Sequence, residues 1–425
     1  MTLNELNLCL QYRLLHYGKG FMKRILSTLA IVSSALIWQA CSDDPASSSE
    51  EPGSSASALP TSSAGIDEDE PTGQSSLPDY SRAIAVNKML GHGINFGNSW
   101  DSGIDPQKKC EEGKENDRCY TEGKVYDYLD EKWNNPIDDE WFKIAKDAGF
   151  QSIRLPVRWN QTALQEPPYT IQAERVAGVK HHIDVANSLG MPVVINQHHF
   201  NELYENPDKY LPQFYAIWEQ IAEEFKDYSN DSLVFEVLNE SRGKSDKILA
   251  QMTDSAIKII RKTNPGRTIM IDPGNYGKFD LMGDFADIKD SNIIIDGHYY
   301  EPYSYSHQGH NGACGSLWKP IDQTAALSIV ADLKNYVQLA KKTFPGKNGT
   351  YAPLYIGEFG ASSACEAEGV DDENRSYYIK AIVEVANQLG YTWAIWGFTG
   401  VQFDIYDKGA GEWYPKILEV LQKNM

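Results

Sequence analysis

Residues 233–240 read LVFEVLNE, an apolar run that ends in an amide and a carboxylate. Residues 246–262 follow with apolar side chains spaced for one buried face of a helix. A short apolar run followed by an amphipathic helix is typical of a parallel sheet that is covered by helices. In such folds the chemistry lies at the carboxyl ends of the strands, which is where Asn239 and Glu240 stand.

The same unit repeats along the chain after Tyr80. Eight apolar runs predict strands at residues 92–96, 152–155, 192–196, 233–238, 268–271, 293–297, 354–357 and 392–397. Amphipathic patterns predict helices at residues 138–148, 171–189, 211–225, 246–262, 325–343 and 373–389, with a weak one at 276–285 and a short one after Pro415. Eight units in about 350 residues predict an α/β fold of the (β/α)8 TIM-barrel type. A doubly wound sheet is the alternative, but the glycine-rich phosphate loop that it would normally carry is absent from the sequence.

The first 41 residues predict an export segment. Met22-Lys23-Arg24 precedes an apolar run over residues 25–38 that is too short to span a bilayer, and Ala40-Cys41 resembles the boundary of a bacterial lipoprotein signal. Ordinary cleavage with an incidental Cys41 is the alternative, and either Met1 or Met22 is the true start. We therefore expect a protein that is secreted or held at the outer surface by a lipid anchor on Cys41.

Residues 42–78 predict a disordered linker. They are rich in serine, proline and acidic residues and contain no lysine or arginine. Such a segment buries too little apolar surface to offset the entropy of ordering. Residues 79–425 remain as one folded domain, which we expect to be monomeric.

The charge balance bears on the partner. The 425 residues contain 39 Lys and Arg against 59 Asp and Glu, which gives a formal charge of −20. A nucleic-acid or anionic-membrane partner would need a basic face, so both are excluded. The expected partner is neutral or is handled by carboxylates.

Four cysteines lie in the predicted domain, and export permits disulfides among them. Cys110 and Cys119 are close in one polar loop, so we pair them, and by elimination we pair Cys314 with Cys365. A zinc site is the other use for four cysteines. The sequence contains no Cys-x-x-Cys spacing, so we predict no metal.

Polar residues that would be costly inside an apolar barrel stand at nearly every predicted strand end. They are Asn95, Arg154, His198, His199, Asn239, Glu240, His298, Tyr300, Glu358 and Trp396. Glu240 and Glu358 close two of the runs, so in a barrel both point over one central pit. Paired carboxylates in such a place are what glycoside hydrolysis needs.

These residues also resemble a known family. The set Ile153-Arg154-Leu155-Pro156, His198-His199, Leu238-Asn239-Glu240, His298-Tyr299-Tyr300 and Ile356-Gly357-Glu358, followed by the Trp396 strand, resembles glycoside hydrolase family 5 over residues 80–425. The segment from His298 to Gly309 looks most like the bacterial endoglucanases of that family.

The resemblance implies a retaining double displacement without a cofactor. Glu358 would be the nucleophile, and Glu240 would be the acid and then the base. Since an ionised Glu358 disfavours a second charge nearby, Glu240 is expected to keep its proton at working pH.

Supporting roles follow from residue type and from the match. Arg154 and Tyr300 would hold the Glu358 carboxylate, and Asn239 would bind the sugar 2-hydroxyl. His198 and His298 fit hydroxyl binding or a proton network, and Trp396 fits a floor for the sugar ring.

Some side chains have a structural reading as well. Glu236 lies inside its strand and is expected to be a buried ion-pair partner. Trp396 could pack in the core, as could Trp393 beside it. For Asn95, Trp100, Trp159 and His199 the choice between core packing and substrate contact stays open.

The choice of substrate depends on the loops around the cleft. Residues 101–135 form a long polar insertion, and such loops decide which glycan fits a cleft. We expect a secreted or surface-tethered endo-β-1,4-glucanase acting on cellulose-like β-glucan. A β-mannanase, a mixed-linkage or xyloglucan-active glucanase, and a non-catalytic glycan-binding surface lipoprotein are the alternatives.

Overall fold

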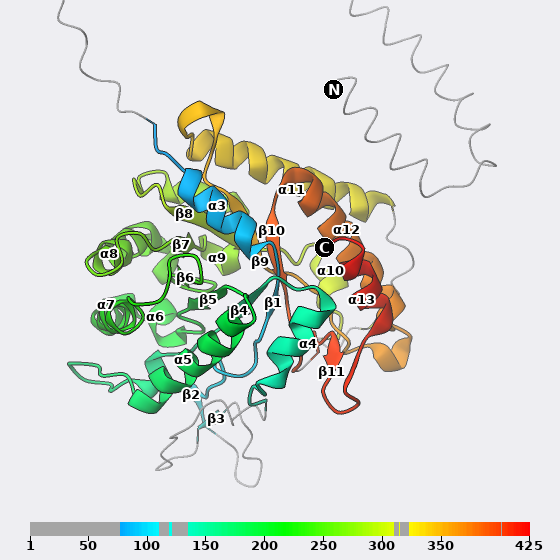
Figure 1. The fold of residues 1–425 in the computed structure, drawn as a ribbon, viewed down its shortest axis with the longest axis horizontal. Helices are drawn as coiled ribbons and strands as arrows, with labels where there is room; N and C mark the ends of the chain where they lie inside the picture. Colours follow the sequence, from blue (N-terminus) through cyan, green and yellow to red (C-terminus); the bar gives the residue numbers. More distant parts are fainter. Residues whose placement is uncertain (1–76, 110–118, 121–134, 310–313, 315–322, 401) are drawn as a thin grey trace, which may run out of the picture. The chain divides into compact units, whose positions relative to one another are not determined.

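The computed structural model describes residues 77–109, 119–120, 135–309, 314, 323–400 and 402–425. Eight parallel strands form a closed barrel in the order β1-β10-β9-β8-β7-β6-β5-β4 (Figure 1). They are β1 His92–Asn95, β4 Ser152–Leu155, β5 Val193–Asn196, β6 Leu233–Glu236, β7 Ile269–Ile271, β8 Ile293–His298, β9 Leu354–Glu358 and β10 Thr392–Ile395. The predicted TIM barrel is confirmed, and each predicted strand is present.

Helices follow the strands and cover the outside of the barrel (Figure 1). They are α4 Glu140–Ala148, α5 Ala173–Ser188, α6 Asn201–Glu205, α7 Pro207–Glu224, α8 Leu249–Arg261, α9 Gly274–Gly277, α10 Tyr303–Ser306, α11 Gln323–Thr343, α12 Asp372–Leu389 and α13 Pro415–Gln422. The segment after β7 holds only the short α9 and a 3₁₀ helix at Phe279–Phe285, in agreement with its weak pattern. Among the described residues, no helix is both long enough and apolar enough to cross a bilayer.

A helix that the sequence analysis did not predict, α3 Ser81–Leu90, precedes β1. Its buried side chains Ala83, Val86 and Leu90 pack onto a ring of inward-facing strand residues. That ring consists of Val194, Val234, Met270, Ile294, Tyr355 and Ala394. Helix α3 therefore closes the end of the barrel at which the strands begin, which we call the lower end.

A second core lies between the barrel and the outer helices. It buries large side chains such as Trp159, Trp218 and Trp393, all with no exposed surface. Trp393 is thus a core residue, because it alternates with inward-facing Ala394 along β10. Two small strand pairs lie outside the barrel: β2 Asp105–Lys109 with β3 Cys119–Tyr120, and β11 Tyr406–Asp407 with β12 Glu412–Trp413.

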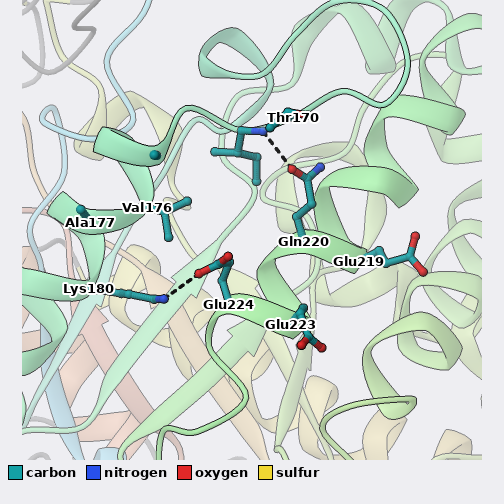
Figure 2. Close-up of a pocket in the computed structure, with 10 residues that line it drawn as sticks. Thr170, Val176, Ala177, Lys180, Glu219, Gln220, Glu223 and Glu224 are labelled. Atoms are coloured by element: carbon teal, nitrogen blue, oxygen red, sulfur yellow. Dashed lines mark hydrogen bonds and ion pairs between the residues drawn. The ribbon is translucent and has the colours of Figure 1, made fainter.

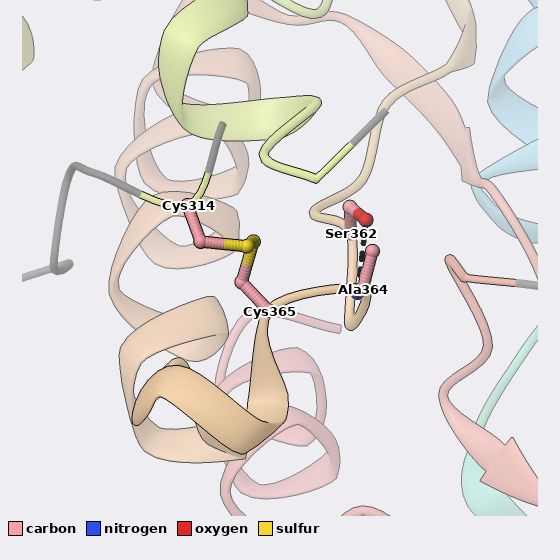
Figure 3. Close-up of a disulfide and its surroundings, with 4 residues drawn as sticks. All are labelled: Cys314, Ser362, Ala364 and Cys365. Carbon is pink, nitrogen blue, oxygen red and sulfur yellow. Dashed lines mark hydrogen bonds between the residues drawn. A yellow bond between two sulfur atoms is a disulfide. The ribbon is translucent and has the colours of Figure 1, made fainter. Parts of the chain in front are cut away.

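The predicted Cys314–Cys365 disulfide is present, with the two Cα atoms 5.6 Å apart. Figure 3 shows that it joins the loop after β8 to the loop after β9. Both loops lie at the upper end of the barrel, where the strands finish. Cys110, the partner predicted for Cys119, lies outside the described residues, as do the export segment and almost all of the predicted linker.

Candidate active site

Arg154 on β4 organises the upper interior of the barrel. Its side chain is fully buried and makes five hydrogen bonds. Two run to the carboxylate of Glu236 at 2.7 Å each, and one runs to Glu358 Oε1 at 2.7 Å. The other two reach Asn95 Oδ1 at 2.9 Å and Asn239 Oδ1 at 2.6 Å. Because a guanidinium has a fixed planar fork of donors, it fixes all four partners together.

Glu358 ends β9 and is held from two sides. Arg154 donates to its Oε1, and the Tyr300 hydroxyl donates to its Oε2 at 3.2 Å. Burial raises the pKa of Glu358, and nearby Glu240 adds to this, whereas His298 and Arg154 oppose it. These two contacts fix the carboxylate at the upper end of the barrel, at a site that we call the pit and define by Glu240, His298, Tyr300 and Glu358.

Glu240 lies two residues beyond the apolar run of β6 and is half-buried. Its backbone is left-handed, with φ of 47°, and its N–H donates to Asp272 Oδ2 at 2.7 Å. The Glu240 Oε1 atom contacts His298 Nδ1 at 2.9 Å. One oxygen of Glu240, one of Glu358 and a nitrogen of His298 lie within 4.8 Å of one another. The two predicted catalytic carboxylates therefore lie at one site, each close to His298 Nδ1.

His298 lies against both carboxylates, with its Nδ1 2.9 Å from Glu240 Oε1 and 3.5 Å from Glu358 Oε2. Burial alone would lower the pKa of His298, but the carboxylates of Glu358, Asp272 and Glu240 outweigh it and raise the pKa to about 10. Although burial opposes it, the hydrogen bond and charge of His298 lower the pKa of Glu240 to about 2. The charge on Glu358 was expected to keep the proton on Glu240, whereas the hydrogen bond with His298, at 2.9 Å, acts on the pKa of Glu240 in the opposite direction. Glu240 and His298 therefore form one hydrogen-bonded pair, and the place of the proton within it stays a prediction.

Trp396 and His198 form the next part of the upper end. Their rings are stacked with centroids 6.0 Å apart and an angle of 6°, and Trp396 is partly exposed. His198 is buried, and its Nδ1 contacts the Asn196 amide at 3.1 Å. His199 is half-buried, and its Nε2 lies 3.8 Å from Asp101 Oδ2. These three predicted residues lie around the pit and add a flat apolar surface to it.

The side chains of three further predicted residues form hydrogen bonds with protein groups: Asn95, Trp100 and Trp159. Asn95 uses its oxygen on Arg154 and its amide on the carbonyl of Gly357 at 2.8 Å, so it supports the barrel. Trp100 donates to His182 Nδ1 at 2.7 Å on α5. Trp159 donates to the Asn196 carbonyl and is fully buried. All three side chains are thus engaged with protein groups, and the substrate contacts of Asn95 and Trp100 stay predictions.

Three further carboxyl groups lie below the pit. Glu236 is the bidentate ion-pair partner of Arg154, as its place inside a strand indicated. Asp296 is fully buried, and neither of its oxygens has a hydrogen-bond partner in the described part of the chain. Burial and Glu236 raise the pKa of Asp296 well above its ordinary value. Burial also raises the pKa of Asp272 to about 8. An acid inside an apolar strand was the only signal for Asp296, and Asp272 stands in an Asp-Pro-Gly stretch that resembles an ordinary turn.

The buried side-chain amide of Asn239 indicates which kind of ligand atom this site would bind. Asn239 accepts from Arg154, which fixes its oxygen, while its Nδ2 has no hydrogen-bond partner within the described ranges. A buried donor left without a partner costs free energy, so a ligand oxygen there would be favoured.

Several groups of side chains have the composition of a metal site. Glu240, His298 and Glu358 form one, and the others are Asp101 with His198 and His199, and Asp139 with His181 and His182. In the first group, Glu358 forms an ion pair with Arg154 at 2.7 Å, and Glu240 contacts His298 at 2.9 Å.

A separate groove lies on the outer surface between α5 and α7 (Figure 2). Its volume is about 640 Å³, and the Lys180–Glu224 ion pair of 2.7 Å lies along it. Gln220 also accepts from the Ile171 N–H there. None of the carboxylates of the barrel interior described above lines this groove.

Comparisons with known proteins agree with this geometry. Residues 116–401 match the family described as "Cellulase (glycosyl hydrolase family 5)". Endoglucanase H of Acetivibrio thermocellus is 28% identical over 295 residues, which is 68% of this chain and 31% of that protein. The chain therefore matches only about a third of the length of that relative.

Solved structures extend the likeness to the fold. A hyperthermophilic endo-β-1,4-glucanase, solved with substrate, is 32% identical with a TM-score of 0.68 and is matched over 80% of this chain and 99% of its own. Cel5A of Thermotoga maritima, solved with mannotriose, is 30% identical with a TM-score of 0.67 over the same shares.

Proposed function

Because the chain belongs to glycosyl hydrolase family 5, we propose that it is a retaining endo-β-1,4-glucanase that cleaves internal bonds of cellulose-like β-glucan. One observation carries the proposal: oxygens of Glu240 and Glu358 lie within 4.8 Å of each other. Retaining enzymes place their carboxyl groups about 5 to 5.5 Å apart, whereas inverting enzymes need about 6.5 to 9.5 Å to admit a water.

In the first step, a Glu358 oxygen attacks the anomeric carbon. The bond from that carbon to the glycosidic oxygen breaks, and its electron pair stays on the departing oxygen. That oxygen takes the proton held by the Glu240–His298 pair. Arg154 and Tyr300 keep the nucleophile aimed, and the glycosyl ester with Glu358 is the product.

In the second step, water attacks the same carbon from the side that the leaving group has vacated. Glu240 takes a proton from this water, and the ester bond to Glu358 breaks with its electrons returning to the carboxylate. Two inversions give net retention. The unpartnered Asn239 amide fits a sugar hydroxyl in both steps, and Trp396 supplies a flat surface for the ring.

The substrate is tested with purified protein on carboxymethylcellulose, lichenan, xyloglucan and galactomannan. We expect new reducing ends and a rapid fall in viscosity on the β-1,4-glucans, because internal cuts shorten chains quickly. NMR of the first product should show the β-anomer before mutarotation. The α-anomer as first product would overturn the retaining mechanism, and slow viscosity loss with steady sugar release would overturn internal cleavage.

A β-mannanase is the second candidate, and one observation favours keeping it. Cel5A of Thermotoga maritima, 30% identical, has been crystallised with mannotriose as well as with cellobiose. Activity on galactomannan alone would keep the mechanism and replace the substrate. Binding without turnover on all four polymers would favour a glycan-binding protein.

A further inference from the structure

One peptide unit, between Asn239 and Glu240, is held on both sides. Its carbonyl oxygen accepts from the Tyr204 hydroxyl at 2.6 Å, and its N–H donates to Asp272 Oδ2 at 2.7 Å. Tyr204 comes from α6 and Asp272 from the end of β7, so two separate loops meet on one peptide. The next carbonyl, that of Glu240, accepts from Arg242 at 3.1 Å.

This peptide sets the direction of the Glu240 side chain. Glu240 has φ of 47°, a left-handed conformation that is sterically unfavourable for a residue with a side chain. Such a conformation persists only where the surroundings over-determine it. Rotation of the preceding peptide would break both hydrogen bonds and turn the carboxylate away from His298.

The two groups that hold the peptide are themselves rigid. Tyr204 is 1% exposed and Asp272 is 3% exposed. The Arg242 guanidinium covers the Tyr204 ring at 4.4 Å from its centroid. On the other side, a Cβ added to Gly277 would lie 2.7 Å from Asp272 Oδ1 and 3.1 Å from the His298 ring. Asp272 is thus packed near His298, which contacts the Glu240 carboxylate.

We propose that Asp272 and Tyr204 are positioning residues for the acid, which act by locking the Asn239–Glu240 peptide in the orientation that aims Glu240. The inference rests on the proposed glycosidase function. It assigns these residues to the protonation of the leaving group, because Tyr204 and Asp272 hold the peptide before Glu240, whereas Arg154 and Tyr300 hold Glu358.

The test uses this separation between acid and nucleophile. Cleavage of cellotetraose needs a proton on the leaving oxygen, whereas 2,4-dinitrophenyl β-cellobioside carries a leaving group that needs none. Because kcat/KM reports the steps up to the first bond cleavage, it isolates the contribution of the acid on each substrate.

Asp272→Ala should lower kcat/KM on cellotetraose by about 100-fold, with most of the loss in kcat, since misplacement of a catalytic group by about 1 Å can cost that much. On the aryl cellobioside the loss should stay below about threefold. Asp272→Asn keeps an oxygen acceptor of the same shape and should recover all but about threefold of the cellotetraose activity. Tyr204→Phe, which keeps the ring, should lose about tenfold on cellotetraose and little on the aryl substrate.

Asp290→Ala is the matched control, because Asp290 is a partly buried acceptor for Arg261 in the loop before β8, at the lower end. It should lower the melting temperature without a selective effect on cellotetraose. Equal losses on both substrates in Asp272→Ala and Tyr204→Phe, or no loss in either, would overturn the positioning role. If Asp272→Ala does not fold, Tyr204→Phe and Asp272→Asn decide by the same ratio. Wild-type inactivity on both substrates would instead overturn the proposed function itself.

Discussion

The upper and lower halves of the barrel interior are built by the same strands and have opposite chemistry. In the lower half, Val194, Val234 and Met270 pack against α3 and carry no charge. Two residues further along the same strands stand Asn196, Glu236 and Asp272. Because side chains alternate along a strand, a step of two residues stays on the inner face and moves up one layer.

The difference teaches that stability and chemistry are separated by one layer of side chains. The lower layer buries apolar surface, which stabilises the fold without directing it to any ligand. The upper layer buries charges, which are costly unless paired, and pairs them through Arg154. Substitutions in the two layers should therefore fail in different ways.

The largest effect is expected for Glu358→Gln in the upper layer. The amide cannot form the glycosyl ester, so kcat on carboxymethylcellulose should fall by about a thousandfold or more. The fold should be retained, because an amide oxygen still accepts from Arg154. The measurement is reducing-sugar release together with the melting temperature, and near-normal turnover would show that Glu358 is not the nucleophile.

Glu240→Ala should come next. Loss of a general acid and base costs about 10² to 10⁴-fold, so hydrolysis of polysaccharide should fall within that range. An aryl cellobioside with an activated leaving group should retain far more of its kcat/KM. Azide can replace the water that Glu240 would have activated, and it should restore part of the turnover as a β-glycosyl azide. Equal loss on polymer and aryl substrate would remove the acid role.

In the lower layer, Met270→Ala should change stability and leave the chemistry alone. Met270 is fully buried against α3. The cavity left by its truncation to alanine should cost about 2 to 5 kcal/mol in the free energy of unfolding. Urea unfolding gives the loss, and kcat/KM below the transition should stay within about twofold of wild type, since no catalytic contact changes. A large fall in kcat/KM of the folded variant would mean that the two layers are coupled.

The smallest effect is expected for Asp296→Asn. Asp296 is one of the acidic residues of the upper layer. Burial, with Glu236, raises the pKa of this carboxyl in the folded protein, so the group contributes stability below its unfolded pKa of about 3.9 and that contribution is lost as pH rises toward the folded pKa. Asp296→Asn removes the titrating carboxyl group, so the variant does not lose this stability as pH rises. The melting temperature of the variant minus that of wild type should increase by a few degrees between about pH 4 and pH 8. A constant difference would place an ionised Asp296 in the folded state at all these pH values.

Much of this contrast could be predicted from the sequence. The eight strands were predicted correctly because the side chains on both faces of each strand are buried. Each strand is therefore a short apolar run, as in residues 293–295. Glu240 and Glu358 were found because an acid directly after such a run has no structural reason to be there. Helix α3 was missed, since it buries mainly small side chains and its apolar pattern is weak.

The partners of the site could not be predicted. Glu236 was identified as an ion-pair residue, but only the closed barrel places it opposite Arg154, 82 residues earlier in the chain. The hydrogen bond of Glu240 was missed for a related reason. Repulsion between Glu240 and Glu358 was considered, whereas the 2.9 Å contact with His298 depends on another strand of the barrel, β8.

Helix α3 and the last helix, α13, have a practical consequence for handling the enzyme. Pro78, just before α3, accepts from the Lys347 N–H, and Met425 lies beside the turn at Gly149. Both contacts are with loops that enter strands, so residue 77 and residue 425 emerge at the end opposite to the pit. A fusion partner or an immobilisation tag at either position would leave the upper end of the barrel, where Glu240 and Glu358 lie, unobstructed, and a bead or surface coupled there would face away from that end.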